Sequence, residues 1–263
     1  MALNQGPTLR SRMALWSAPQ ISVNALKIAG MVLMTMYFFS LTVVQRGLLP
    51  IADYTAEELN ELLSADPQAM LWAGIGSVMS VIGIMSLPIF AYLLVQGVEH
   101  TASIQRYILT VLVFAVISEV PYDLATSGQV WDWSSQNSLW TVFVALVMLW
   151  LMHTFQGKGM LPVVLDILIA AAGCFWAILL NALFGGGFVL IVAILYLLRE
   201  RKAAGCLLGV LVSLLYTSAP LGFIPVAMSS GRRRPWKLWA KYACYAFYPV
   251  MLGVFALITY LVA

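Results

Sequence analysis

Long apolar runs, separated by short polar stretches, dominate the pattern of this chain. Six stretches of 18 or more residues contain no Asp, Glu, Lys or Arg, namely 28–45, 67–98, 133–157, 167–198, 203–231 and 242–263. A helix of about 18–20 apolar residues crosses the ~30 Å hydrocarbon layer of a bilayer. The pattern therefore predicts an all-α protein, a polytopic helical bundle that crosses a membrane several times.

Breaks within these runs divide the chain into about eight hydrophobic segments. Pro88 is expected to kink the second, because proline lacks a backbone N–H. The sequence "FGGG" at 184–187 divides 160–198 into two helices. The expected segments are 25–46, 68–98, 104–121, 137–155, two within 160–198, 203–228 and 240–262. Together they form one integral-membrane domain, 1–263, with a polar segment at 1–24 and a helical bundle over 25–262.

A short helix is expected in the acidic loop after the first segment. The sequence "TAEELNELL" begins with Thr55 as an N-cap and places Glu57 and Glu58 in the first turn. We expect this helix to lie at the membrane–water interface.

Composition agrees with lipid as the main partner. The chain is 62% hydrophobic and 10% charged, and its mean hydropathy is +0.92, whereas soluble domains carry about 25% charged residues. The net charge of +3 needs no nucleic acid to explain it, because basic residues beside apolar runs set membrane topology. The three cysteines lie in apolar segments and are interpreted as small buried hydrophobes.

The distribution of Lys and Arg predicts a multi-pass protein of the cell (inner) membrane with its N-terminus in the cytoplasm. The basic connections 99–106, 153–158 and 199–202 fall inside, and the acidic loop 53–66 falls outside. The rule fails if 203–229 crosses once, because the basic stretch 232–241 then lies outside. Either that segment is re-entrant or the late topology is an exception.

Few ionisable groups lie near the membrane segments, where they mark function or a buried pair. Glu119 and Asp123 are four residues apart, on one helical face, and Pro121 is expected to end or bend their helix. Glu119 suits a proton acceptor, a cation ligand or an ion-pair partner of Arg106 or Arg199. The alternative is that both carboxyl groups fix the helix end through hydrogen bonds.

The remaining candidates for chemistry are sparse. His100 and His153 are the only histidines, and both fall at helix ends; Asp166 is expected at the interface. Two distant histidines and no CxxC pair argue against zinc, and no phosphate loop is present. The basic run "RRRPWKLW" is typical of a lipid-headgroup anchor, and Arg232, Arg233 and Arg234 would also suit the phosphates of an anionic donor.

Two adjacent stretches carry a family resemblance. "SLPIFAYLLVQGVEHT" (86–101) and "RYILTVLVFAVISEVPYDLATSG" (106–128) closely resemble the TraX family of bacterial membrane proteins. Weaker similarities follow in the same order at 26–34, 136–152 and 245–258. The resemblance implies a multi-pass acetyltransferase scaffold that uses acetyl-CoA, with a role in conjugation and a pilin-like protein as acceptor. It also makes Glu119, Asp123 and His100 the expected catalytic centre.

The departures from the family pattern remove reactive groups. Where the family carries an Asp-His pair, an Arg and a C-terminal His, this chain has Tyr37-Phe38, Ile84 and Met251. Acyl transfer needs a general base, most often His, and cationic groups for the developing charge. Two further interpretations therefore stand beside an active acetyltransferase: an impaired relative acting as a membrane scaffold or partner subunit, and a small-solute transporter using Glu119.

Overall fold

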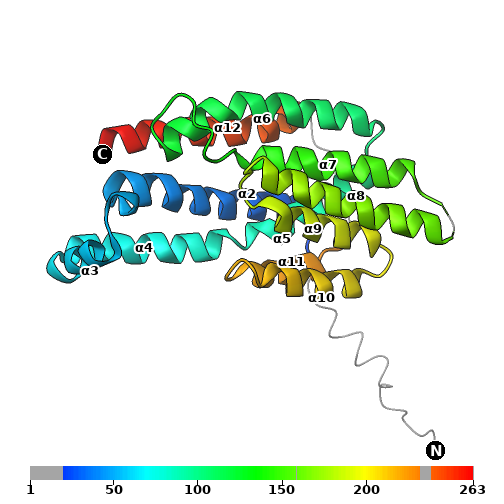
Figure 1. The fold of residues 1–263 in the computed structure, drawn as a ribbon, viewed down its shortest axis with the longest axis horizontal. Helices are drawn as coiled ribbons and strands as arrows, with labels where there is room; N and C mark the ends of the chain where they lie inside the picture. Colours follow the sequence, from blue (N-terminus) through cyan, green and yellow to red (C-terminus); the bar gives the residue numbers. More distant parts are fainter. Residues whose placement is uncertain (1–19, 158, 232–237, 263) are drawn as a thin grey trace, which may run out of the picture.

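The fold is helical throughout the residues that a computed structural model describes, which are 20–157, 159–231 and 238–262 (Figure 1). Within those ranges strand pairing is limited to two isolated bridges, Ile21 with Ser229 and Gln136 with Ala182. The elements in chain order are α2 (Val23–Phe39), the π-helix η1 (Ser40–Leu48), η2 (Ile51–Asp53), α3 (Ala56–Ala65), α4 (Pro67–Gly83), α5 (Ser86–Glu99), α6 (Ile104–Thr126), α7 (Ser138–Thr154), α8 (Met160–Leu179), α9 (Gly185–Leu197), α10 (Lys202–Ser213), η3 (Ala219–Gly222), α11 (Phe223–Ala227) and α12 (Leu238–Val262).

Five helices are long and apolar enough to cross a membrane. They cover Val23–Leu48, Pro67–Glu99, Ile104–Thr126, Met160–Leu179 and Tyr242–Val262. Three shorter apolar helices, Ser138–Thr154, Gly185–Leu197 and Lys202–Ser213, occupy three of the other expected positions. The class and the membrane character are confirmed, while eight crossing segments remain an expectation.

The first segment changes its helical type halfway along. α2 begins at the N-cap Ser22, and from Ser40 the chain winds as a π-helix. The hydroxyl of Ser40 donates to the main-chain oxygen of Gly76 at 2.7 Å, which ties this point to α4. At the end of η1, Arg46 donates to the carbonyl groups of Leu124 and Ala125, so it closes the C-terminus of α6, where the last carbonyls lack helical partners.

The second segment is broken before Pro88 rather than at it. α4 ends at Gly83, and α5 begins at Ser86 with Pro88 in its first turn. Proline cannot donate to the carbonyl four residues earlier, and its ring clashes there, so the break falls at Ile84–Met85. The close approach of two other segments also fixes this break. An added Cβ at Gly83 would lie 2.5 Å from the Tyr37 nitrogen, and one at Gly222 would lie 2.1 Å from the Met85 oxygen.

α6 continues through Pro121 to Thr126, so the expected boundary at 121 is five residues early. The helix ends where other groups take over its carbonyls. The main-chain N–H groups of Ser127 and Gly128 both donate to the main-chain carbonyl oxygen of Asp123, at 2.8 and 3.0 Å. Both Glu119 and Asp123 consequently lie inside a helix rather than beyond its end.

The segment from 202 to 229 folds back on itself. α10 leads to a turn, and η3 and α11 bring the chain back beside α10 (Figure 1). The Nζ of Lys202 donates to the main-chain oxygens of Ala227 and Ser229, at 3.2 and 2.7 Å. The start and the end of this segment therefore lie together, the arrangement that the re-entrant alternative requires.

Two hydrophobic cores hold the bundle together. The larger is built mainly from α5, α7 and α9 and includes Ile89, Leu149 and Val192. The smaller joins α2, η1, α6 and α12 through Phe38, Val43, Tyr122, Tyr248, Met251, Leu252 and Phe255. The two carboxyl groups of α6 lie beside this smaller core.

Candidate functional site

Glu119 and Asp123 form a buried pair of carboxyl groups on α6. Only 3% of Glu119 and 1% of Asp123 is exposed. Residues four apart on a helix share one face, and α6 turns this face toward α7, α12 and the loop that follows it. The sequence correctly indicated that these two residues lie together.

Glu119 is held by two side-chain donors from α7. The Nδ2 of Asn137 and the Nε1 of Trp140, the latter at 2.8 Å, both donate to its Oε2. Asn137 is also the N-cap of α7, since its Oδ1 accepts from the Leu139 N–H at 2.9 Å. Its Nδ2 donates as well to the Ala115 carbonyl, at 2.9 Å. One asparagine thus starts α7 and fixes it against α6.

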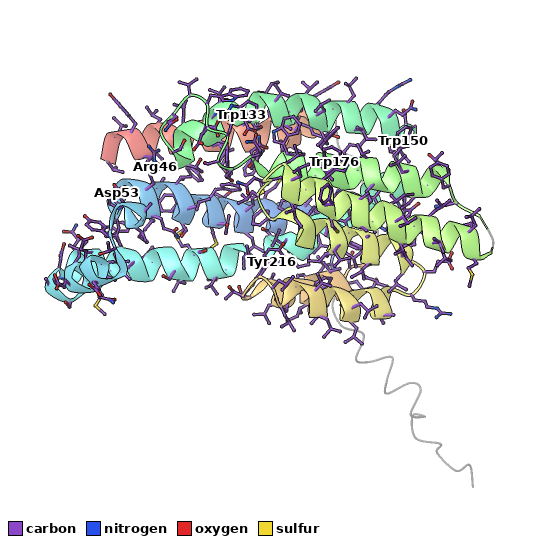
Figure 2. All side chains as sticks on the ribbon, in the orientation of Figure 1. Arg46, Asp53, Trp133, Trp150, Trp176 and Tyr216 are labelled. Atoms are coloured by element: carbon purple, nitrogen blue, oxygen red, sulfur yellow. The ribbon has the colours of Figure 1, made fainter. Side chains whose placement is uncertain are left out.

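Asp123 organises the loop that follows α6. Its Oδ2 accepts from the main-chain N–H of Asp132 at 2.9 Å. Asp132 in turn accepts from the Ser134 N–H at 2.9 Å, and the hydrogen bonds from Ser134 lower the pKa of Asp132. The loop carries the exposed indoles of Trp131 and Trp133, which meet edge to face. Trp133 is labelled in Figure 2.

Aromatic rings and hydroxyls fill the space around these carboxyl groups. The Tyr248 hydroxyl lies 3.0 Å from the Ser138 hydroxyl, and the Tyr122 hydroxyl lies 3.1 Å from that of Ser135. The ring of Phe38 packs edge-on against both tyrosines, with centroids 5.5 Å from Tyr248 and 6.4 Å from Tyr122.

Three of the positions at which this chain departs from the family pattern meet here. Tyr37 and Phe38 contact each other and the smaller core. Met251 belongs to the same core, and its sulfur accepts from the Thr35 hydroxyl at 3.5 Å. Aromatic and thioether side chains of the smaller core, which includes Tyr122 of α6, therefore stand where the resemblance implies histidines. Ile84 lies at the break between α4 and α5, next to Gly83, which closely approaches the Tyr37 backbone, and its side chain packs against the larger core.

His100 lies in a different place, an open cavity of about 650 Å³ at the other end of α6. Its Nδ1 is 3.0 Å from the carbonyl oxygen of Gln96. A carbonyl only accepts hydrogen bonds, so the proton of the neutral ring is on Nδ1 and Nε2 is left as an acceptor. The cavity is lined by Val98, Glu99, His100, Thr101, Ala102, Ser103, Ile104, Gln105, Trp150, His153, Gln156, Tyr196 and Arg199.

An ion pair joins two walls of this cavity. The Nε of Arg199 at the end of α9 lies 3.7 Å from the Oε1 of Glu99 at the end of α5. The guanidinium group also lies 4.4 Å from the centroid of the Tyr196 ring. On the opposite side, the Nε2 of Gln96 donates to the other oxygen of Glu99 at 2.7 Å.

The structure therefore separates the three residues that the resemblance places in one centre. Ile104 lines the cavity of His100, and Glu119 is 15 residues further along α6, or about 22 Å at 1.5 Å per residue. Glu119 and Asp123 stay together, and His100 is instead joined by His153 and Arg199. The basic residues Arg232, Arg233 and Arg234 lie outside the described residues.

The sequence alone does not identify several residues of the Glu119–Asp123 site and of the His100 cavity. It includes Asn137 and Trp140 in the weak family similarity at 136–152, as part of an Asn-x-x-x-Thr helix, but gives neither residue a role. An asparagine ahead of an apolar helix is nevertheless a recognisable N-cap. The sequence offers Arg199 as a topology signal or a partner of Glu119, whereas Arg199 pairs with Glu99. Asp166, on α8, has an Oδ1 without a hydrogen-bond partner among the described residues.

Comparison with protein families gives one result that covers nearly the whole chain. The family model described as TraX protein matches residues 22–259. Comparisons with curated proteins and with solved structures give no match. The matched range contains both candidate sites, the folded-back segment 202–229 and most of the last helix. The chain therefore belongs to the TraX family.

Proposed function

We propose that this protein transfers an acetyl group from acetyl-CoA to an amine or a hydroxyl group, at the cavity that contains His100. A single observation carries the proposal: of the two candidate sites, the cavity is the one that is open and also holds a histidine with a fixed tautomer. Large concave sites with a few convergent polar groups are the usual places for small-molecule chemistry.

His100 supplies the general base. The Gln96 carbonyl holds the proton on Nδ1, so Nε2 accepts the proton of the acceptor amine or hydroxyl as it attacks the thioester carbon. The carbon–sulfur bond then breaks, and the imidazolium returns its proton to the leaving thiolate. His153 and Arg199, which line the same cavity, provide the polar and cationic surroundings for the negative charge that develops on the thioester oxygen.

The proposed membrane placement agrees with this chemistry. With the N-terminus in the cytoplasm, the cavity opens on the cytoplasmic face of the inner membrane, where a soluble donor has access. Arg232, Arg233 and Arg234 belong to a basic stretch that follows the folded-back segment 202–229. We include them as candidate ligands for the phosphates of acetyl-CoA. A membrane-embedded or pilin-like protein is the proposed acceptor.

Acetyl-CoA binding tests the proposal. Calorimetry on the detergent-purified protein is expected to show saturable binding, which His100→Gln and Arg199→Ala weaken at least tenfold. Asp53→Asn, a charge change in the exposed loop after η1, is the control and binds normally. Absence of binding at millimolar acetyl-CoA, in a protein that unfolds cooperatively, would overturn the proposal.

A second candidate function is a membrane scaffold or partner subunit that has lost the chemistry. It is favoured by the convergence of Tyr37, Phe38 and Met251 in the smaller core, because these side chains supply no base where the family pattern has histidine. This candidate predicts a well-folded protein without acetyl-CoA binding that associates stably with a second membrane protein. The same calorimetric measurement separates the two functions.

A further inference from the structure

The buried carboxyl groups of α6 each keep one oxygen unused. The Oε1 of Glu119 and the Oδ1 of Asp123 have no hydrogen-bond partner among the described residues, although 3% and 1% of these residues is exposed. The neighbouring hydroxyl of Ser118, fully buried, is unpartnered in the same part of the chain. Buried polar atoms are nearly always hydrogen-bonded in proteins, so three unpartnered oxygens within six residues require an explanation.

In the part of the chain that the structure describes, no cationic side chain compensates the two carboxyl groups. Neither Glu119 nor Asp123 has an ion-pair partner there, and the Glu99–Arg199 pair lies at the other end of α6. Arg46, which reaches the end of α6, uses its guanidinium on the carbonyls of Leu124 and Ala125. The titratable groups around the pair are the phenols of Tyr122 and Tyr248 and the carboxyl group of Asp132, and the Tyr37 phenol interacts in turn with Tyr122.

The two free oxygens belong to residues on the same face of α6. Side chains four residues apart on a helix start about 5–6 Å from each other, a separation that two carboxyl groups can bridge through one ion. Between them Pro121 lacks an N–H, so the Ile117 carbonyl is left without its usual helical donor. The atoms at this turn that could bind a cation are therefore all oxygens, the ligands that hard cations prefer.

We propose that Glu119 and Asp123 bind one alkali-metal cation between Oε1 and Oδ1. The described residues contain no cluster of three or more His, Cys, Asp or Glu side chains that would hold a metal ion. Because no third anionic or histidine ligand among these residues joins the pair, we assign a monovalent ion rather than a divalent one. The bound cation replaces the missing ion-pair partner and fixes α6 against α7. This site is separate from the His100 cavity and does not depend on acetyl transfer.

Thermal unfolding in detergent tests the site with inorganic salts as probes. At constant ionic strength, NaCl or KCl is expected to raise the Tm by several degrees relative to choline chloride, because a ligand of the folded state stabilises it. Glu119→Gln and Asp123→Asn are expected to abolish this difference. Glu61→Gln, the same change at an exposed position on α3, is expected to retain it.

Direct binding of radiolabelled Na⁺ to the unaltered protein tests the site even if a variant is too unstable to purify. The unaltered protein is expected to bind the label saturably, and unlabelled Na⁺ or K⁺ to displace it. Equal Tm values in all three chlorides, stabilisation by Ca²⁺ or Mg²⁺ alone, or a response to pH without a response to Na⁺ or K⁺ would each overturn the alkali-metal site.

Discussion

The Nζ of Lys202 lies 2.7 Å from the main-chain oxygen of Ser229, and this contact fixes the path of the chain between them. The same end of the segment is also tied to the start of α2, because the Ser230 N–H donates to the Ile21 oxygen at 2.9 Å. Ser229 and Ser230, which precede the basic stretch in the chain, therefore lie near the starts of α10 and α2. If 202–229 returns to the same side of the membrane, as this path allows, the basic stretch obeys the positive-inside rule.

Cysteine labelling in intact cells checks this topology. With the three native cysteines replaced, single cysteines at Glu200 and Ser230 are expected to react from the same side of the membrane. A cysteine at Asp53, in the loop after η1, is expected to react from the opposite side. Opposite labelling of Glu200→Cys and Ser230→Cys would show that 202–229 crosses the membrane.

Two glycines of α4 form a matched pair for testing the packing of α4 against α2. A Cβ at Gly83 would lie 2.5 Å from the Tyr37 nitrogen, whereas nothing lies within 4 Å of one at Gly74. Gly83→Ala is expected to destabilise the protein by about 1–3 kcal/mol, because a backbone cannot yield as a side chain does. Gly74→Ala is expected to be neutral or to stabilise by up to ~1 kcal/mol. Denaturant unfolding in mixed micelles measures both; equal effects would contradict the close approach.

Asn137 has two separable duties, which substitutions distinguish. Asn137→Ala removes the N-cap of α7 and the amide that donates to Glu119 and Ala115. Asn137→Ser restores a capping oxygen but not the bridging amide. We expect both variants to lose about 1–3 kcal/mol of stability, because both leave the buried acceptor oxygens of Glu119 and Ala115 without the Asn137 donor. The Ala variant is expected to lose more than the Ser variant, because it also lacks the capping oxygen. If denaturant unfolding gave Asn137→Ser the stability of the unaltered protein, the bridge to α6 would contribute nothing.

The short helix α3 is expected to loosen in acid. Thr55 and Glu58 form a capping box, with the Thr55 N–H and hydroxyl both 2.8 Å from the Glu58 Oε2, and these bonds lower the pKa of Glu58. A lowered pKa in the folded state stabilises the helix above the unfolded value of about 4.3, and the stabilisation is lost as pH falls through the folded value.

Hydrogen exchange of the α3 amides measures this effect. Protection is expected to fall as the pH drops below about 4. Glu58→Gln is expected to remove most of this pH dependence, since its side chain does not titrate. Glu61→Gln, on the same helix but outside the capping box, serves as the control. An unchanged pH profile in the Glu58 variant would show that another group controls the helix.

Local chemistry made several features readable from the sequence. The charge-free runs determined the all-α class and the membrane-type helices, since only lipid covers so much apolar surface. Thr55 started its helix as expected, and "FGGG" separated α8 from α9. The spacing of Glu119 and Asp123 placed them on one face because that face follows from helical geometry alone. The stretch 86–128 indicated the family, which the match over 22–259 confirms.

Tertiary contacts decided the rest. The break at Ile84–Met85 depends on Gly83 and Gly222 meeting distant backbone, and no local pattern encodes that meeting. The return of 202–229 depends on Lys202 bonding to residues 25 and 27 positions later. The meeting of His100 with His153 and Arg199 depends on which ends of the helices come together. Periodicity fixes the faces of each helix, but the packing of helices against one another determines which faces and ends meet.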